Sequence, residues 1–201
     1  AEKVGAALDQ MTEANVHPAL PVRYEGRAHG MPVAWHVGPS GIIVNAYAKR
    51  FVSEYDYNLG AVLNQRDQSG NPLHLPAWVI CDRPFIYRNL PFAWYAFRAK
   101  GWIRKAPTLL ALAKKIGLDP KPLEDTVDTF NHYCKQNFDP DFHRGEALWE
   151  RMRSGNWKAG EKNLSLGGIG KGPYYAMPIN RSILGTKGGP LTNAKGQVLS
   201  T

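Results

Sequence analysis

The clearest hydrophobic pattern of the chain lies between residues 108 and 136. One apolar stripe recurs there at spacings of 4, 3 and 4 residues, formed by Leu123, Val127, Phe130 and Cys134. Such spacing places the four side chains on one face of a helix that packs on a core. Asp119 and Pro120 suit the start of this helix, and Thr108 and Gly117 suit the two ends of a shorter helix before it. The pattern predicts two consecutive helices.

Short apolar runs bounded by polar turns predict strands. Residues 42–44 are expected to form a buried strand, 45–49 a turn, and 50–53 the returning strand of a hairpin. A second buried strand is expected at 78–80, and a short helix is expected at 58–65. Strands and helices therefore alternate irregularly in this half of the chain.

The remaining stretches are less regular. Residues 1–15 carry apolar side chains at helical spacing and predict a helix, whereas Pro and Gly in 15–32 predict loop or short extended pieces. A long loop with one short helix is expected at 137–163, and one or two strands are expected at 174–184. Short strands, irregular loops and a helix pair together predict an α+β fold.

The composition is that of an ordinary globular protein. The chain has 201 residues, of which 43% are hydrophobic and 21% are charged, a length that suits one domain or slightly more. No apolar run reaches the roughly 18 residues that a membrane-spanning helix needs. Because the chain starts with Ala and shows no signal peptide, both ends are interpreted as cut from a longer protein. Two cysteines are too few for a disulfide framework, which predicts a reducing, cytoplasmic setting.

The formal net charge of +8 raises the question of nucleic-acid binding. Basic residues gather among aromatic ones in one stretch: Arg98, Lys100, Arg104, Lys105, Lys114 and Lys115. No signature of a nucleic-acid-binding fold accompanies them. A solvated face beside an aromatic cluster is the favoured interpretation, and a basic nucleic-acid-binding module is the alternative from another class of protein.

Few stretches carry recognisable catalytic chemistry. The segment "GGIGKGP" at 167–173 lacks the Ser or Thr that follows Lys in a phosphate-binding loop. The six histidines show no metal-ligand spacing with either cysteine, so no metal site is predicted. Tyr55 and Tyr57 lie where a helix is expected to begin. A tyrosine ordinarily ionises near about pH 10, and helix N-terminal amides favour an anion, so either tyrosine is a candidate acid or base.

Several motifs, in order from about residue 38 to 201, resemble one family of flavoproteins. "GIIVNAYAKRFVSE" resembles the segment (I/L)-x-V-N-x-x-G-(R/K)-R-F-x-(N/D)-E of the fumarate reductase and succinate dehydrogenase superfamily. "PAWVICD", the helix pair "APTLLALAKKIGLD", "DPDFHRG" and "GPYYAMPI…LGTKGGP" resemble further motifs of that superfamily. The most similar branch is the 3-ketosteroid dehydrogenase-like group. Gly185 occupies the place of the histidine in H-T-x-G-G, which disfavours a dicarboxylate substrate.

This resemblance implies a substrate (cap) domain, a small mixed sheet with packed helices, inserted into an FAD-binding domain. Residues 1–30 would leave the FAD-binding domain, 31–184 would form the substrate domain, and 185–201 would re-enter the FAD-binding domain. The family's G-x-G-x-x-G fingerprint is missing before residue 38, so FAD is expected to be bound mainly by another part of the protein, and the isolated chain is expected to be inactive.

The activity implied by the resemblance is the introduction of a double bond next to a ketone, with a small hydrophobic ketone as substrate. In the family, the tyrosine that acts as the base follows the motif R-F-x-N-E in the pattern E-x-x-x-Y. Tyr57 follows Glu54 at a spacing one residue shorter and is expected to be the base, with Tyr55 as the alternative. Gly185, Thr186, Gly188 and Gly189 are expected to approach the flavin. A fumarate reductase-like domain that acts on another small acid is the alternative within the enzymes.

Overall fold

The protein is described by a computed structural model that covers residues 2–32, 37–88, 102–155 and 162–201. Its strands are β1 (Leu8–Asp9), β2 (Ala14–Tyr24), β3 (Arg27–Pro32), β4 (Gly41–Val44), β5 (Ala77–Cys81), β6 (Arg104–Ala106), β7 (Tyr174–Thr186) and β8 (Gly189–Pro190). Its helices are η1 (Glu2–Val4), α1 (Leu59–Leu63), α2 (Arg83–Arg88), α4 (Leu109–Ile116), α5 (Pro120–Gln136) and α6 (Leu148–Ser154). The predicted α+β class is confirmed.

Strand β7 connects the whole sheet. Its first half pairs with β5 and β6, and its second half pairs with β2, which in turn pairs with β3. The sheet order is β3-β2-β7-β5-β4, with β6 also on β7. A mixed sheet was expected, but the pairings among the described strands are antiparallel.

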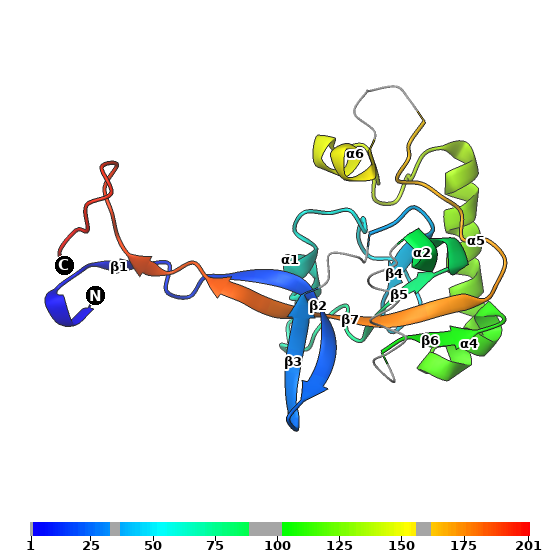
Figure 1. The fold of residues 1–201 in the computed structure, drawn as a ribbon, viewed down its shortest axis with the longest axis horizontal. Helices are drawn as coiled ribbons and strands as arrows, with labels where there is room; N and C mark the ends of the chain where they lie inside the picture. The colour runs from blue at the N-terminus through cyan, green and yellow to red at the C-terminus, as the bar shows by residue number, and fades with distance from the viewer. Residues whose placement is uncertain (1, 33–36, 89–101, 156–161) are drawn as a thin grey trace.

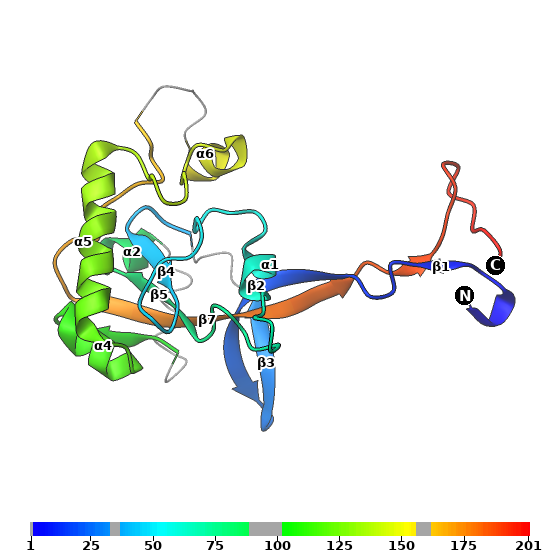
Figure 2. The same cartoon turned by 180° about the vertical axis from the view of Figure 1, so that it is seen from behind.

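The body of the molecule extends into a narrow arm, seen from both sides in Figures 1 and 2. The outer parts of β2 and β7 leave the body together, and β1 and β8 pair further out. Both ends of the chain lie at the tip of the arm (Figure 1), where Ala6 bridges Ser200. The arm therefore consists of the first and last segments of the sequence.

Two apolar clusters cover the two faces of the sheet. Ile42 and Val44 belong to the cluster under α4 and α5, whereas Ile43 belongs to the opposite cluster with residues of α1 and α2. Side chains of a strand alternate between the two faces of the sheet, and both faces are covered here. Every residue of β4 is therefore buried, and its sequence is a continuous apolar run. This burial explains why the strand at 42–44 was recognisable.

The predicted helix pair is confirmed, including its ends. The Thr108 side chain accepts from the Ala111 amide at 3.1 Å, and Gly117 ends α4 with a φ of 77°. Asp119 caps α5 by accepting from the Lys121 amide at 3.1 Å. Of the predicted apolar stripe, Cys134 is half-buried, and the other three side chains are buried. The expected helix near 58–65 and strand near 78–80 are present as α1 and β5.

Two local predictions were wrong at the N-terminal end. The helix expected over 1–15 is one short 3-10 turn followed by strands, because this segment pairs with the other end of the chain. The Pro-containing stretch 15–32, expected to be loop or short extended pieces, contributes most of the β2–β3 hairpin. In the first case, pairing partners far away in sequence outweighed the local pattern. In the second case, β2 pairs both with its neighbour β3 and with the distant β7.

The hairpin expected over 42–53 is only partly present. The Asn45 side chain accepts from the amides of Tyr47 and Lys49, which closes the turn with Ala48 at a φ of 58°. Beyond the turn, a single bridge joins Val44 to Arg50 and no second strand forms. At this point the Arg50 side chain enters the charge network described below.

The remaining sequence predictions concern residues 137–184, the basic stretch and membrane-spanning helices. The short helix expected within 137–163 is α6, and the strand expected over 174–184 is β7. Arg98 and Lys100 of the basic stretch lie outside the described residues. In the part of the chain that the structure describes, no helix is long and apolar enough to cross a membrane.

Gly60 in α1 provides a test of this packing. A Cβ atom there would lie 2.1 Å from the Val16 carbonyl oxygen, so α1 rests directly on the backbone of β2. Helix propensity alone predicts that Gly60→Ala stabilises the protein by up to about 1 kcal/mol. We expect the opposite, a loss of about 2 kcal/mol, because backbone atoms cannot move aside.

Denaturant unfolding of the two variants Gly60→Ala and Ala61→Gly measures this difference. Ala61 is exposed in the same helix, so its variant reports propensity alone, with an expected cost of at most about 1 kcal/mol. A stabilised Gly60→Ala protein would show that α1 does not press on β2.

Candidate active site

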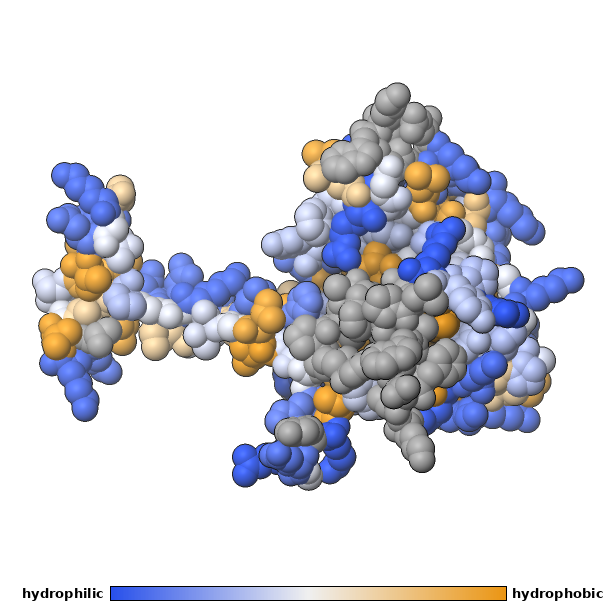
Figure 3. Space-filling model, viewed as in Figure 1, coloured by the Kyte–Doolittle hydropathy of each residue, from blue (hydrophilic) through white to orange (hydrophobic). Residues whose placement is uncertain are grey.

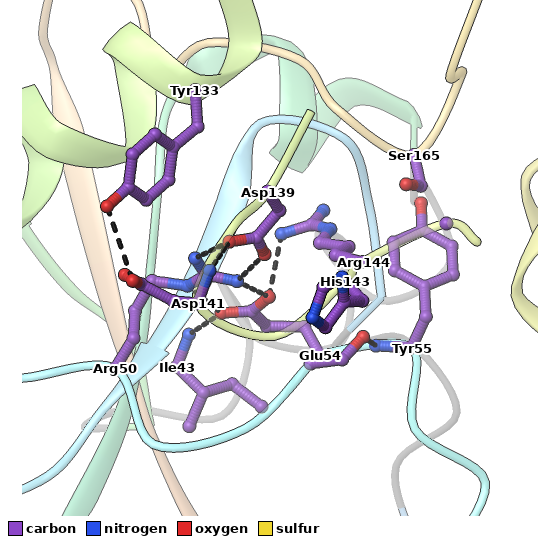
Figure 4. A network of polar contacts seen from close by, with 12 residues as sticks. Ile43, Arg50, Glu54, Tyr55, Tyr133, Asp139, Asp141, His143, Arg144 and Ser165 are labelled. Carbon is purple, nitrogen blue, oxygen red and sulfur yellow. Dashed lines mark hydrogen bonds and ion pairs between the residues drawn. The ribbon is translucent and has the colours of Figure 1, made fainter. Parts of the chain in front are cut away.

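A buried network of two arginines and two carboxylates lies at the centre of the candidate site (Figure 4). Arg50 Nε and Nη2 each donate to Glu54 at 3.0 Å, and Arg144 Nη1 donates to Glu54 Oε2 at 2.8 Å. Arg50 also pairs with Asp139 at 2.8 Å. The four side chains carry two positive and two negative charges, so the buried charge is balanced.

The same network ties three segments of the backbone together. Glu54 Oε1 accepts from the Ile43 amide at 3.0 Å, which fixes the carboxylate to β4. Arg144 donates to the carbonyl oxygens of Gly41 at 2.9 Å and Gly38 at 2.6 Å. Residues 38–43, the segment around Glu54, and the loop at 139–144 are therefore held as one unit.

The protonation states follow from these contacts. Burial alone would raise the pKa of Glu54, but the charges of Arg50 and Arg144 outweigh burial and hold the pKa of Glu54 below its ordinary value. Burial lowers the pKa of Arg50, and Glu54 and Asp139 more than compensate, so its pKa lies above the ordinary value. All of these contacts favour the charged forms, as a buried ion-pair network requires.

Tyr55 follows Glu54 directly and is buried beside the network (Figure 4). The Arg144 guanidinium lies 4.9 Å from the centre of its ring. Burial raises the pKa of Tyr55, and the nearby Arg144 opposes that shift only in part. Tyr55 therefore stays protonated more readily than an ordinary tyrosine.

Tyr57 has a different environment, because its side chain is 75% exposed. Its ring packs edge-on against Trp149 of α6, with ring centres 5.2 Å apart. The neighbouring Glu150 is buried, accepts a hydrogen bond from the Ser53 hydroxyl, and accepts another from the Gly145 amide at 2.6 Å. Helix α6 is thus attached to the segment that carries both tyrosines.

Tyr55 and Tyr57 line one cavity of about 520 Å³. Its other walls come from the first residues of β2, from α6, from Leu184 near the end of β7 and from Lys187 just after β7. A second cavity, of about 570 Å³, shares Tyr55 and Arg153 with the first. Segments around residues 15, 57, 150 and 185, far apart in sequence, therefore meet at this cavity.

The four residues predicted to approach the flavin lie in the arm and flank, in sequence, Leu184 and Lys187, which line this cavity. Gly185 and Thr186 end β7, and Gly189 opens β8. A Cβ atom on Gly185 or Gly189 would meet nothing within 4 Å, so no contact inside the described chain requires glycine there. Gly188 differs, since its Cβ would lie 2.6 Å from the Gln10 carbonyl oxygen. The free space beside Gly185 and Gly189 leaves room for another group, such as a flavin, to approach the backbone. Gly188, in contrast, is required by the packing of the arm itself.

Sequence reasoning missed the roles of four residues of the site. Arg144 and Glu54 were quoted only as parts of motifs, and Trp149 and Glu150 lay in the stretch predicted as a long loop with one short helix, with no role assigned to them. Their importance depends on contacts across about 90 residues or more, such as Glu54 with Arg144 and Ser53 with Glu150. Within the described ranges, no three His, Cys, Asp or Glu side chains come together as a metal site would require.

Comparison with known proteins then identifies the family. A family described as "FAD binding domain" matches residues 1–201. The chain belongs to the FAD-binding domain family. This membership confirms the predicted flavoprotein class, with FAD as the family's cofactor.

Two curated relatives of the family are dehydrogenases. The 3-oxosteroid 1-dehydrogenase of Mycolicibacterium smegmatis is 33% identical over 216 residues, which cover 99% of this chain and 36% of that protein. The 4-oxocyclohexanecarboxylate 2-dehydrogenase of Sinomonas cyclohexanicum is 34% identical over 172 residues, covering 81% of this chain and 29% of that protein. The chain thus spans about a third of the length of the relatives that it matches.

A solved structure supports the same branch of the family. The 3-ketosteroid delta1-dehydrogenase of Sterolibacterium denitrificans, in complex with 1,4-androstadiene-3,17-dione, matches with a TM-score of 0.77 at 30% identity, covering 100% of this chain and 37% of that chain. The fumarate reductase of Shewanella frigidimarina matches at a lower identity of 28%. The resemblance to 3-ketosteroid dehydrogenase-like flavoproteins is confirmed.

The charge network predicts a specific response to acid. Because Glu54 has a lowered pKa in the folded protein, its stabilising effect is complete above the unfolded pKa of about 4.3 and is lost as the pH falls through the lower folded value. At neutral pH we expect Glu54→Gln to lower the free energy of unfolding by about 3–5 kcal/mol, since it leaves buried arginine charge uncompensated.

Denaturant unfolding between neutral pH and acid measures this effect. The difference between the original protein and Glu54→Gln should shrink as the pH falls below about 4. The matched control is Glu146→Gln, because Glu146 is exposed and pairs with exposed His143. An equal loss of stability in both variants would contradict the central role of Glu54.

Proposed function

We propose that this chain is the substrate domain of an FAD-dependent dehydrogenase that introduces a double bond next to a ketone. In this proposal residues 31–184 form the substrate domain, and residues 1–30 and 185–201 connect it to the FAD-binding domain. The arm supports this proposal, since it contains both chain ends (Figure 1).

The observation that carries the proposal is the shared cavity. Tyr57, the candidate base, and Leu184, next to the predicted flavin contact Gly185, line the same hollow of about 520 Å³. About 130 residues separate the two segments in sequence. A dehydrogenase of this kind needs a base and a hydride acceptor on neighbouring carbons of one substrate, and this cavity supports such an arrangement.

The exposed apolar surface of the arm supports the proposed connection to another domain. Orange patches mark it in Figure 3, and its exposed apolar side chains are Val4, Met11, Ile183, Leu184, Leu191, Val198 and Leu199. Contiguous exposed apolar surface ordinarily marks an interaction site. We infer that the FAD-binding domain packs against this surface.

The reaction requires the removal of one proton and one hydride from adjacent carbons. A ketone acidifies the C–H bond next to it, and Tyr57, as its phenolate, takes that proton on its oxygen. The electron pair left behind forms the new C=C bond as the hydride leaves the adjacent carbon. FAD, when bound, supplies the acceptor for this hydride, which no side chain can supply.

The two tyrosines suit different roles. Tyr57 is exposed in the cavity, and Tyr55 is buried with a raised pKa. A buried phenol that keeps its proton is suited to donate a hydrogen bond, whereas an exposed one can reach a substrate. These differences favour Tyr57 as the base.

The proposed substrate is a small hydrophobic cyclic ketone. The two named relatives act on a 3-oxosteroid and on 4-oxocyclohexanecarboxylate, both of which carry a ketone on a six-membered ring. Gly185 stands where the dicarboxylate-specific enzymes carry a histidine, which further supports a ketone. A cytoplasmic location stays a prediction from the two unpaired cysteines.

Substitution of the base tests the proposed function. In the full-length flavoprotein, Tyr57→Phe should lower kcat on a 3-oxosteroid by about 10²–10⁴-fold, the usual contribution of a general base. Tyr55→Phe is the matched control and should lower kcat by less than about tenfold, because it removes only a supporting hydroxyl. Steady-state kinetics with a dye acceptor measures both, and a fully active Tyr57→Phe enzyme would exclude Tyr57 as the base.

The proposed domain assignment makes a separate prediction for the 201-residue chain alone. Because FAD would be held mainly by the other domain, the purified chain should show no visible flavin absorbance after incubation with FAD and gel filtration. Retention of bound flavin in stoichiometric amount would contradict this assignment.

A further inference from the structure

The side chain of Tyr57, the proposed base, makes few contacts that would fix its orientation. It is 75% exposed, and within the described part of the chain its recorded side-chain partner is the ring of Trp149. The two rings meet edge-on, at an interplanar angle of 86° and with centres 5.2 Å apart. This is the favourable geometry for an aromatic pair.

Trp149 is in turn held in place by its own surroundings. The Arg153 guanidinium lies 5.7 Å from the centre of the Trp149 ring, one helical turn along α6. The next residue after Trp149, Glu150, is buried and bonded to the Ser53 hydroxyl and the Gly145 amide. Helix α6 is therefore fixed to the body through a residue adjacent to Trp149.

Two contacts join α6 to the two ends of the segment 53–57, which carries both tyrosines. Glu150 contacts Ser53 at the start of the segment, and Trp149 contacts Tyr57 four residues later. Ser53 Oγ also accepts from the Tyr55 amide at 3.3 Å, which fixes the backbone between them. The orientation of the Tyr57 ring thus depends on α6.

We propose that Trp149 is a positioning residue for Tyr57. Proton transfer requires the base to lie within hydrogen-bond reach of the substrate carbon, and small displacements lower the rate steeply. An exposed tyrosine samples several rotamers, and the edge-on contact with Trp149 selects one of them. This inference rests on the proposed role of Tyr57 as the base.

A double-mutant cycle on kcat in the full-length flavoprotein tests the inference. Trp149→Ala should lower kcat by about 10–100-fold and leave KM within about twofold. The same change made in the Tyr57→Phe background should have no further effect on kcat, because Trp149 would act only through the Tyr57 hydroxyl. Additive losses of kcat, an unchanged kcat, or a change in KM alone would each overturn the inference.

Two further variants separate positioning from folding. Trp149→Phe keeps an aromatic ring and should restore kcat to within about fivefold of the original enzyme. Met152→Ala is the matched control, because Met152 lies on the same helix with the same 39% exposed fraction as Trp149, and it should keep the original kcat. Flavin content and thermal midpoint are measured for every variant, and a loss in Met152→Ala equal to that in Trp149→Ala would overturn the inference.

The outcomes also separate this inference from the proposed function. Full activity of Tyr57→Phe would remove the role of Tyr57 and the inference with it. Loss of activity in Tyr57→Phe, combined with additive behaviour of Trp149→Ala, would overturn the inference and leave the proposed function intact.

Discussion

The contact between Glu54 and two arginines is the constraint on which the site depends. One carboxylate receives Arg50, Arg144 and the Ile43 amide, so a strand, a turn and a distant loop share one buried anchor. Removing water from these groups is costly, and only a complete set of partners compensates for that cost. The geometry of the network is therefore strongly determined. Tyr55 and Tyr57 lie one and three residues after Glu54, so the anchored Glu54 determines where this segment of the backbone lies.

Strand β7 provides the second constraint, because it runs from the core to the arm. Its first half lies between β5 and β6, and its second half leaves the body alongside β2. Gly185 is consequently brought to the edge of the cavity that Tyr57 lines. The sheet thus determines where the proposed base and the proposed flavin contact meet.

The buried network is built from residues of two family motifs. "RFVSE" supplies Arg50 and Glu54, and "DPDFHRG" supplies Asp139 and Arg144. Each motif supplies one positive and one negative charge to the network, and the pairs Arg50–Asp139 and Arg144–Glu54 join the two motifs. The buried network therefore joins two segments that carry the family resemblance and lie 90 residues apart in sequence.

Local sequence was sufficient for the elements whose signals are local. The caps at Thr108 and Asp119 and the stripe on α5 depend on hydrogen bonds and spacings within a few residues. The continuous apolar run of β4 was recognisable for the same kind of reason. The motifs, which are also local, led to the correct family.

Long-range contacts decided the rest. Residues 1–15 have helical spacing, yet they form strands because the end of the chain pairs with them. Arg50 makes one bridge to Val44 in place of the expected strand, and two carboxylates, one of them 89 residues away, bind its guanidinium. Trp149 gained its place beside Tyr57 from a hydrogen bond between Glu150 and Ser53, 97 residues apart. No local pattern contains these partners, because their free energy arises only when the folded chain brings them together.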